Sequence, residues 1–142
     1  MPHSAALASL PHGPEFRFID EVLELEPGQS GTGRYAVRGD EAFLSAHFPG
    51  NPLMPGVILI EALAQLGGVV AQSDPKTAPL REVRLAAVQT AKITGSAVPG
   101  ETLTIQAKVT GRLGPLVQVQ GTVETGGRRL LDARITLSGT AG

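Results

Sequence analysis

The 142-residue chain contains no cysteine, and its charges are nearly balanced, with 12 lysines and arginines against 13 aspartates and glutamates. Without cysteine, the chain has neither a disulfide framework nor a thiolate metal site. A net charge of −1 gives no electrostatic reason to expect binding to nucleic acid or to an anionic membrane. Any choice of partner must therefore come from local patches.

The chain also lacks an apolar run long enough to cross a membrane, because Val57–Ala71 is too short and contains Glu61. The first ten residues, MPHSAALASL, lack the basic region and the longer apolar stretch of a signal peptide. We therefore expect a cytoplasmic protein. At this length it should form a single domain over residues 1–142, with residues 1–10 disordered.

The most informative stretch of the sequence runs from His47 to Gln72. Its first ten residues, HFPGNPLMPG, hold three prolines and two glycines, a density that neither a helix interior nor a central strand accommodates. These residues predict a rigid loop. The next sixteen residues contain no proline and are apolar or small except for Glu61, Gln65 and Gln72, which predicts a buried helix.

The start of this helix has the features of a reaction site. Pro55 and Gly56 suit a first helical turn, where the free N–H groups and the helix dipole stabilise a developing oxyanion. His47 lies in the preceding loop, and Glu61 follows on the helix with Gln65 four residues later on the same face. A histidine and a carboxylate of this kind are the ingredients of acid–base chemistry.

Each of these residues also has a structural interpretation. Alternatively, His47 is a hydrogen-bonded structural histidine. Gln65 could likewise form a hydrogen bond to Glu61 in a purely structural pair. A buried carboxylate without a partner is costly, however, which favours a functional role for Glu61. His12 and Asp20 are interpreted as structural.

The rest of the chain predicts a strand-rich domain. We expect strands at Phe16–Leu25, Ser30–Arg38, Val83–Thr94, Glu101–Arg112, Leu116–Glu124 and Arg129–Ser138, and a short helical turn at Asp40–Ser45 capped by Asp40. The last four strands are separated by Gly and Pro pairs typical of successive hairpins. Apolar and polar residues alternate within them, as in an antiparallel sheet covered on one face. The sequence therefore predicts an α+β fold in which an antiparallel sheet wraps around one long buried helix.

The segment HFPGNPLMPGVILIEALAQ, from His47 to Gln65, resembles the signature of the beta-hydroxyacyl-acyl-carrier-protein dehydratases of fatty acid synthesis. Two further segments are similar to that family, LPHGPEFRFIDEV at Leu10–Val22 and VPGETL at Val98–Leu103. The resemblance implies the hot-dog fold. It also implies removal of water from 3-hydroxyacyl thioesters on acyl carrier protein to give trans-2-enoyl thioesters, without a cofactor or a metal.

The resemblance and local chemistry together suggest a role for each site residue. His47 would be the base at C2, because an imidazole exchanges protons efficiently near neutral pH. Glu61 would hold a proton and assist the departing hydroxyl, with Gln65 orienting it. The N–H of Gly56 would hold the enolate oxygen. The family further implies that the carbonyl of Val57 orients the imidazole, and that glutamate rather than aspartate at position 61 gives dehydration without isomerisation.

The family also implies how the chain assembles. Two protomers would form a homodimer with a continuous sheet and with sites at the interface, where His47 of one chain meets Glu61 of the other. Many members form hexamers as trimers of dimers. Acyl carrier proteins are acidic, so a docking face should be basic. The candidate docking residues are Arg81, Arg84, Lys92, Arg128 and Arg129. Alternatively, these residues are simply solvated ends of strands.

Other functions stay open at this point. A hot-dog thioesterase or an enoyl-coenzyme A hydratase would share the fold, although such enzymes usually place their acid and histidine in different motifs. A non-catalytic subunit of a heteromeric dehydratase is a second alternative, against which the presence of both His47 and Glu61 argues. A dehydratase of a secondary pathway would have the same chemistry.

Overall fold

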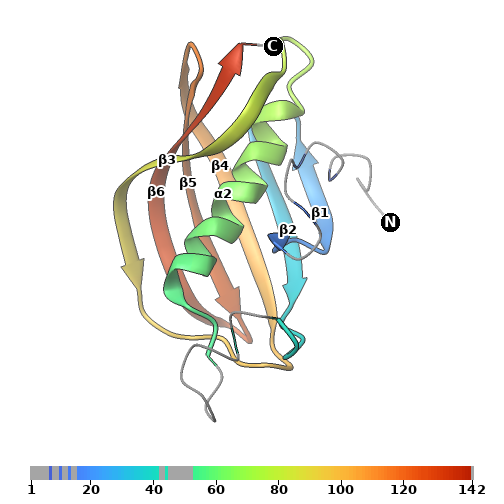
Figure 1. Ribbon diagram of the computed structural model, residues 1–142, viewed down its shortest axis with the longest axis vertical. Coiled ribbons are helices and arrows are strands. Elements are labelled where there is room, and N and C mark those ends of the chain that lie inside the picture. Colours follow the sequence, from blue (N-terminus) through green and yellow to red (C-terminus); the bar gives the residue numbers. More distant parts are fainter. Residues whose placement is uncertain are drawn as a thin grey trace.

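The computed structural model describes residues 16–41 and 53–141, together with Leu7, Leu10, Gly13 and Leu44. These residues form one helix of 17 residues and a six-stranded sheet (Figure 1). The elements are β1 (Glu21–Glu26), β2 (Ser30–Ala36), α2 (Gly56–Gln72), β3 (Leu80–Ile93), β4 (Thr102–Leu113), β5 (Leu116–Thr125) and β6 (Arg128–Ala141). Among these residues, no helix is both long and apolar enough to cross a membrane.

The sheet has the order β1-β2-β4-β5-β6-β3, and every neighbouring pair is antiparallel. It curves around α2, which lies along its concave face (Figure 1). This arrangement confirms the predicted α+β class and the hot-dog architecture. It also explains the alternation in the sequence, because every second residue is buried along β5 and along the first half of β4, from Leu103 to Ala107.

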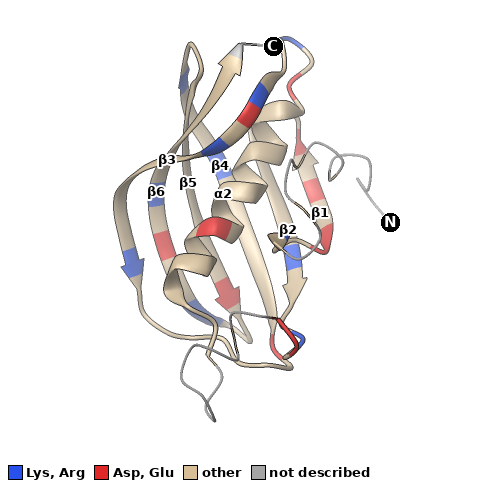
Figure 2. Ribbon diagram, in the orientation of Figure 1, with Lys and Arg blue, Asp and Glu red and all other residues tan. Residues whose placement is uncertain are grey.

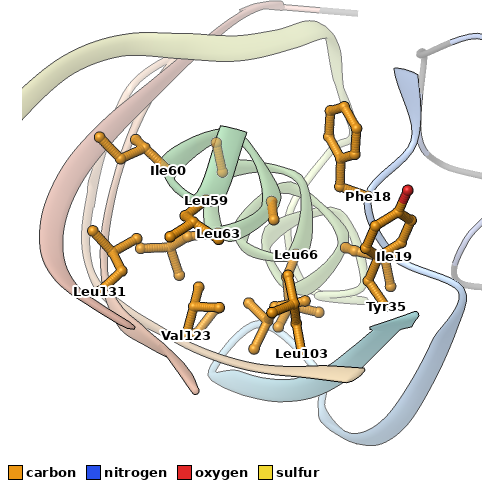
Figure 3. Packing of buried hydrophobic residues seen from close by; sticks show 14 of the residues in the cluster. Phe18, Ile19, Tyr35, Leu59, Ile60, Leu63, Leu66, Leu103, Val123 and Leu131 are labelled. Carbon is orange, nitrogen blue, oxygen red and sulfur yellow. The ribbon is translucent and has the colours of Figure 1, made fainter. Parts of the chain in front are cut away.

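The core lies between α2 and the sheet. Leu59, Leu63 and Leu66 of the helix point toward sheet residues that include Leu103 and Val123 (Figure 3). All five side chains are fully buried. Twelve of the helix residues are buried, as predicted from its nearly continuous apolar sequence.

Two glycines allow the helix and the sheet to approach closely. A Cβ atom added at Gly67 would lie 2.9 Å from a Val119 methyl group on β5. At Gly121, also on β5, an added Cβ would lie 2.1 Å from the backbone oxygen of Gln106 and 2.4 Å from Leu63 Cδ1. The distance between helix and sheet is therefore set by positions that no larger residue can occupy without displacing its neighbours.

The predicted pairing of the strands is wrong at one junction. β3 does not form a hairpin with β4; it pairs with β6 at one edge of the sheet, while β4 lies between β2 and β5. The connection between β3 and β4 crosses the start of α2, where Met54 donates a hydrogen bond to Ala97 O at 2.8 Å and Ala97 is fully buried. The hairpins β4–β5 and β5–β6 are confirmed.

The first strand is shorter than expected. We predicted a strand from Phe16, but β1 begins at Glu21, and an irregularity in its pairing with β2 occurs between Val22 and Glu24. The backbone of Phe16 and Phe18 bonds to Gln65 of the helix instead of to a strand. Half of the turn predicted at Asp40–Ser45 falls outside the described residues, so the turn stays a prediction. The disorder predicted for residues 1–10 falls mostly outside the described residues, of which Leu10 is buried in the core and Leu7 packs against it.

Candidate functional site

The start of α2 is built as the sequence predicted. Pro55 is the N-cap residue, with φ −59° and ψ 142°, and the helix begins at Gly56. A Cβ added at Gly56 would lie 2.7 Å from Ile93 Cδ1, so glycine lets the helix start against the end of β3. No side chain caps this end among the described residues. The N–H groups of the first turn therefore carry the positive end of the helix dipole without a capping carboxylate.

Glu61 is the only charged residue of α2 (Figure 2), and it is half-buried. Its Oε2 accepts a hydrogen bond from Gln65 Nε2 at 3.2 Å. The two residues are one helical turn apart, so the contact follows from their spacing. Gly56 and Val57 precede Glu61 by about 6 to 8 Å along the helix axis.

Gln65 is almost completely buried, at 2 % exposure. Its side chain makes two more hydrogen bonds, both to the segment before β1. Phe18 N donates to Oε1 at 2.9 Å, and Nε2 donates to Phe16 O at 2.9 Å. The amide thus joins the helix, the carboxyl group of Glu61 and the N-terminal segment.

The predicted site residues fall into two groups. Gly56, Val57, Glu61 and Gln65 all lie in the first ten residues of α2, and Gln65 is in direct contact with Glu61. Val57 is 68 % exposed, which is unusual for an apolar residue at the end of a buried helix. His47 lies outside the described residues, so its place relative to the helix stays a prediction.

Arg128 and Arg129, two of the predicted docking residues, are paired with acidic side chains. Arg128 donates to Glu101 at 2.7 Å, and Arg129 donates to Glu124 at 3.0 Å and to Asp132 at 3.3 Å. Three carboxylates thus compensate two guanidinium groups at this end of the sheet. By itself, this pair does not form a positive patch.

The other three docking candidates lie on β3 and are exposed. Arg81 and Arg84 are near its beginning and Lys92 is near its end, so basic residues stand at both ends of the strand (Figure 2). About 35 Å of extended chain separates Arg81 from Lys92. Lys92 precedes Ile93, the residue that contacts Gly56, and is therefore the one closest to the start of α2.

A second polar cluster, built around the buried side chain of Tyr35, lies beside the N-terminal segment and was not predicted. Tyr35, 1 % exposed, donates its hydroxyl to Glu41 at 2.6 Å, and Glu41 also accepts from the N–H groups of Arg38 and Gly39 at 3.0 and 2.7 Å. Arg38 pairs with Asp20 and lies over the Tyr35 ring, with 5.0 Å from its guanidinium carbon to the ring centroid. This cluster ends where the chain enters the segment that contains His47.

The pKa values of this cluster follow from its contacts. Burial raises the pKa of the Tyr35 hydroxyl well above its ordinary range, and the hydrogen bond to Glu41 raises it further. Burial acts to raise the pKa of Glu41 as well, but the hydrogen bonds from Tyr35 and from the two backbone N–H groups outweigh it, and the net shift is downward. Tyr35 therefore remains a donor and Glu41 an ionised acceptor at neutral pH.

Little in the sequence indicates the hydrogen bonds of Gln65 and Glu41 that were not predicted. The hydrogen bonds of Gln65 to Phe16 and Phe18 join residues 49 and 47 positions apart and use backbone groups, which carry no residue identity. For Glu41, the neighbouring Asp40 offered an equally good capping side chain in the sequence. Asp20 was interpreted as structural, and it accepts hydrogen bonds from Ala36 N, at 2.8 Å, and from Arg38.

Comparison with known proteins gives consistent results. A family model described as "FabA-like domain" matches residues 10–134. The 3-hydroxyacyl-[acyl-carrier-protein] dehydratase FabZ of Clostridium acetobutylicum is 37% identical over 127 residues, which cover 89% of each chain. The FabZ dehydratase of Chloroflexus aggregans is 40% identical over 103 residues, which cover 72% of this chain and 71% of that one.

Solved structures with a similar fold include two kinds of protein. The dehydratase heterocomplex ApeI:P from Xenorhabdus doucetiae matches with a TM-score of 0.78 at 20% identity, over 94% of this chain and 90% of that one. A hypothetical thioesterase from Streptococcus pneumoniae with coenzyme A matches with a TM-score of 0.63 at 15% identity, over 85% of each chain. At these identities the structures share the fold with this chain, and the match carries no further conclusion.

Proposed function

Because the chain belongs to the FabA-like domain family, we propose that it is a 3-hydroxyacyl-[acyl-carrier-protein] dehydratase of fatty acid biosynthesis. Its substrate is a 3-hydroxyacyl thioester on acyl carrier protein, and its product is the trans-2-enoyl thioester. The observation that carries this proposal is Glu61, a lone half-buried carboxyl group on an otherwise apolar helix, held by a buried amide. A carboxyl group is costly to keep on a helix of this kind, and shifted acid–base groups gather at functional sites, which favours a catalytic role for Glu61.

The chemistry needs a base, an acid and an oxyanion donor. His47 removes the proton from C2, and the N–H of Gly56 at the start of α2 stabilises the enolate oxygen of the thioester. Glu61 gives its proton to the C3 hydroxyl, which leaves as water while the C2–C3 double bond forms. The carbonyl of Val57 orients the imidazole, and Gln65 orients Glu61. The proton on His47 then returns to the carboxylate through solvent.

The edge of the sheet supports a homodimer. β3 is 14 residues long, pairs with β6 on one side, and is exposed or half-buried along its whole length. Ala86, Ala87 and Val88 are exposed in its middle. A long edge strand with a small-residue, uncharged centre is usually paired or covered. We propose that β3 pairs with β3 of a second protomer, so that His47 of one chain works with Glu61 of the other.

This pairing also bears on the docking face. If two copies of β3 join antiparallel near their middle, Arg81 and Arg84 of the partner subunit come close to Lys92. The basic residues at the two ends of β3 would then form one patch beside the start of α2. We propose that the acidic carrier protein contacts this patch, and that Arg128 and Arg129 contribute little because they are already paired. Assembly into hexamers and a cytoplasmic location stay predictions.

The test is a direct assay of the purified protein with 3-hydroxyacyl thioesters, presented in parallel on acyl carrier protein and on coenzyme A. We expect trans-2-enoyl product, formed faster from the carrier-protein substrate, and no cis-3-enoyl product. Release of free thiol without enoyl product would favour the thioesterase alternative. Absence of any reaction with both substrates would refute the proposed function.

A further inference from the structure

The hydrogen-bond partners of the Gln65 side chain fix the positions of its amide oxygen and nitrogen. Phe18 N is a donor and lies 2.9 Å from Oε1, while Phe16 O is an acceptor and lies 2.9 Å from Nε2. Turning the amide over would place two donors together at Phe18 and two acceptors together at Phe16. At 2 % exposure, no solvent is available to relieve either conflict. The orientation is therefore set by the backbone of the N-terminal segment.

With the amide held this way, Gln65 can only donate to Glu61. Its Nε2 has two hydrogens, and one is used by Phe16 O, so the other is directed to Glu61 Oε2 at 3.2 Å. The oxygen that accepts this bond has carbonyl character when the carboxyl group is protonated. A proton on Glu61 is accordingly favoured on the other oxygen, Oε1.

We propose that the backbone of Phe16 and Phe18 acts through Gln65 as the positioning element of Glu61, and selects the carboxyl oxygen that carries the proton given to the substrate. This inference rests on the proposed function, because it assigns a role to Glu61 in the same reaction. It adds the segment before β1 to the site through two backbone groups, Phe18 N and Phe16 O. Gln65 is a positioning residue here, since it acts through Glu61.

The core holds this segment in place. The Phe18 ring is 1 % exposed and packs edge-to-face against Tyr35, with ring centroids 5.8 Å apart, and against Phe16, at 4.9 Å. Phe18 and Tyr35 lie side by side next to α2 (Figure 3). Packing of the aromatic rings thus fixes the two backbone groups that orient the amide.

The same helix contains a matched control. Gln72, the last residue of α2, also makes a two-bond clamp with backbone: Leu80 N donates to its Oε1 at 3.0 Å, and its Nε2 donates to Leu80 O at 2.5 Å. Gln72 has no carboxyl group next to it in these contacts. Replacing either glutamine by methionine removes a helix-to-backbone clamp, but only Gln65→Met removes the donor to Glu61.

The experiment compares wild type, Gln65→Met and Gln72→Met in steady-state dehydration of a 3-hydroxyacyl thioester on acyl carrier protein, with melting temperatures measured on the same samples. We expect both variants to lose thermal stability. In Gln65→Met, kcat should fall about 10- to 100-fold with KM within about twofold of wild type, because a misplaced catalytic group slows the chemical step. In Gln72→Met, kcat should stay within about twofold of wild type.

Gln65→Glu provides a second readout that does not depend on the methionine variants. When protonated, the new carboxyl group offers a C=O to Phe18 N and one O–H, which replaces the two amide hydrogens that Phe16 O and Glu61 accept in wild type; when ionised it offers no donor to either group. Its activity relative to wild type should therefore rise as the pH falls. If the activity of Gln65→Glu relative to wild type does not change with pH, the proposal is contradicted. This test holds even if Gln65→Met does not fold.

The outcomes separate the two levels of inference. An active wild type with equal kcat in Gln65→Met and Gln72→Met overturns the positioning role and leaves the proposed function standing. A wild type that dehydrates no thioester overturns both. A loss of kcat confined to Gln65→Met, with the pH-dependent recovery in Gln65→Glu, supports both.

Discussion

The guanidinium of Arg112 on β4 donates a hydrogen bond to the backbone carbonyl of Ala71 at 3.0 Å, near the C-terminal end of α2. The last turn of the helix contains no basic residue of its own. The sheet thus supplies the positive charge that the negative end of the helix dipole attracts, and it satisfies a carbonyl that has no partner further along the helix. The contact also joins α2 to β4 at the end of the helix remote from Glu61.

Replacing Arg112 by methionine should lower the free energy of unfolding by about 1 to 2 kcal/mol, because both the hydrogen bond and the charge are lost at a half-buried position. Urea unfolding measures the change. The control is Arg129→Met, which removes an exposed arginine from surface ion pairs and should cost at most about 0.5 kcal/mol. Equal losses in the two variants would mean that the contact with Ala71 contributes nothing specific.

Glu41 should make the stability of the protein depend on pH in the acid range. Its folded-state pKa is lowered, since the hydrogen bonds from Tyr35, Arg38 N and Gly39 N outweigh the effect of burial. The unfolded value is about 4.3. The stabilisation is therefore complete above about pH 5 and is lost as the pH falls through the folded-state value.

In Glu41→Gln, the slope of unfolding free energy against pH should be shallower below about pH 5 than in wild type. Denaturant unfolding at a series of pH values measures both slopes. Glu26→Gln, on the exposed side of β1, controls for the loss of one negative charge. Superimposable slopes for wild type and Glu41→Gln would mean that the contacts of Glu41 do not hold its ionised form.

Gly121 should tolerate no side chain. An added Cβ lies 2.1 Å from a backbone oxygen of the neighbouring strand and 2.4 Å from Leu63, so Gly121→Ala should cost about 3 kcal/mol or more. Gly111→Ala on β4 is the control, because its Cβ meets only the end of the Gln118 side chain, at 3.2 Å. Chemical unfolding of both variants decides the question, and similar stabilities would show that the sheet moves to accommodate a methyl group.

The sequence predicted the fold where local pattern and tertiary structure agree. Proline and glycine density placed the start of α2 at Pro55 and Gly56, and alternation in β4 and β5 predicted which residues face the helix. The helix needed no tertiary information, because nearly all its residues are apolar. The ends of the later strands differ from prediction by no more than three residues.

Prediction failed where a distant partner decides the structure. The segment at Phe16 has strand-forming residues, yet its backbone pairs with the side chain of Gln65, 49 residues away, instead of with a strand. Likewise, the Gly and Pro turn after β3 looks like a hairpin, but β3 pairs with β6. Strand pairing depends on which edges remain available in the folded chain, and no local pattern records that.

Glu61→Gln tests the acid in the proposed mechanism. The amide has the same shape and keeps an oxygen for the hydrogen bond from Gln65, but it cannot give a proton to the leaving hydroxyl. Activity should fall by about two to four orders of magnitude, the usual range for a general acid or base, while the melting temperature does not fall. Full activity in this variant would mean that Glu61 is structural.

A mixture of two inactive variants tests the site shared between protomers. If His47 of one chain works with Glu61 of the other, His47→Ala and Glu61→Gln homodimers should each be nearly inactive. After unfolding and refolding as an equal mixture, half of the dimers should contain both variants. In these heterodimers one site carries both defects and the other carries none, so the mixture should recover about a quarter of wild-type activity.

The control for this experiment is each variant refolded alone, which should recover nothing, and heterodimer formation should be confirmed by native mass spectrometry. Were His47 and Glu61 of the same chain to act together, every site would keep one defect however the chains exchanged. A confirmed heterodimer population without recovered dehydration would therefore exclude the shared site. It would leave the fold and the edge pairing of β3 unaffected, because neither depends on where the two catalytic side chains meet.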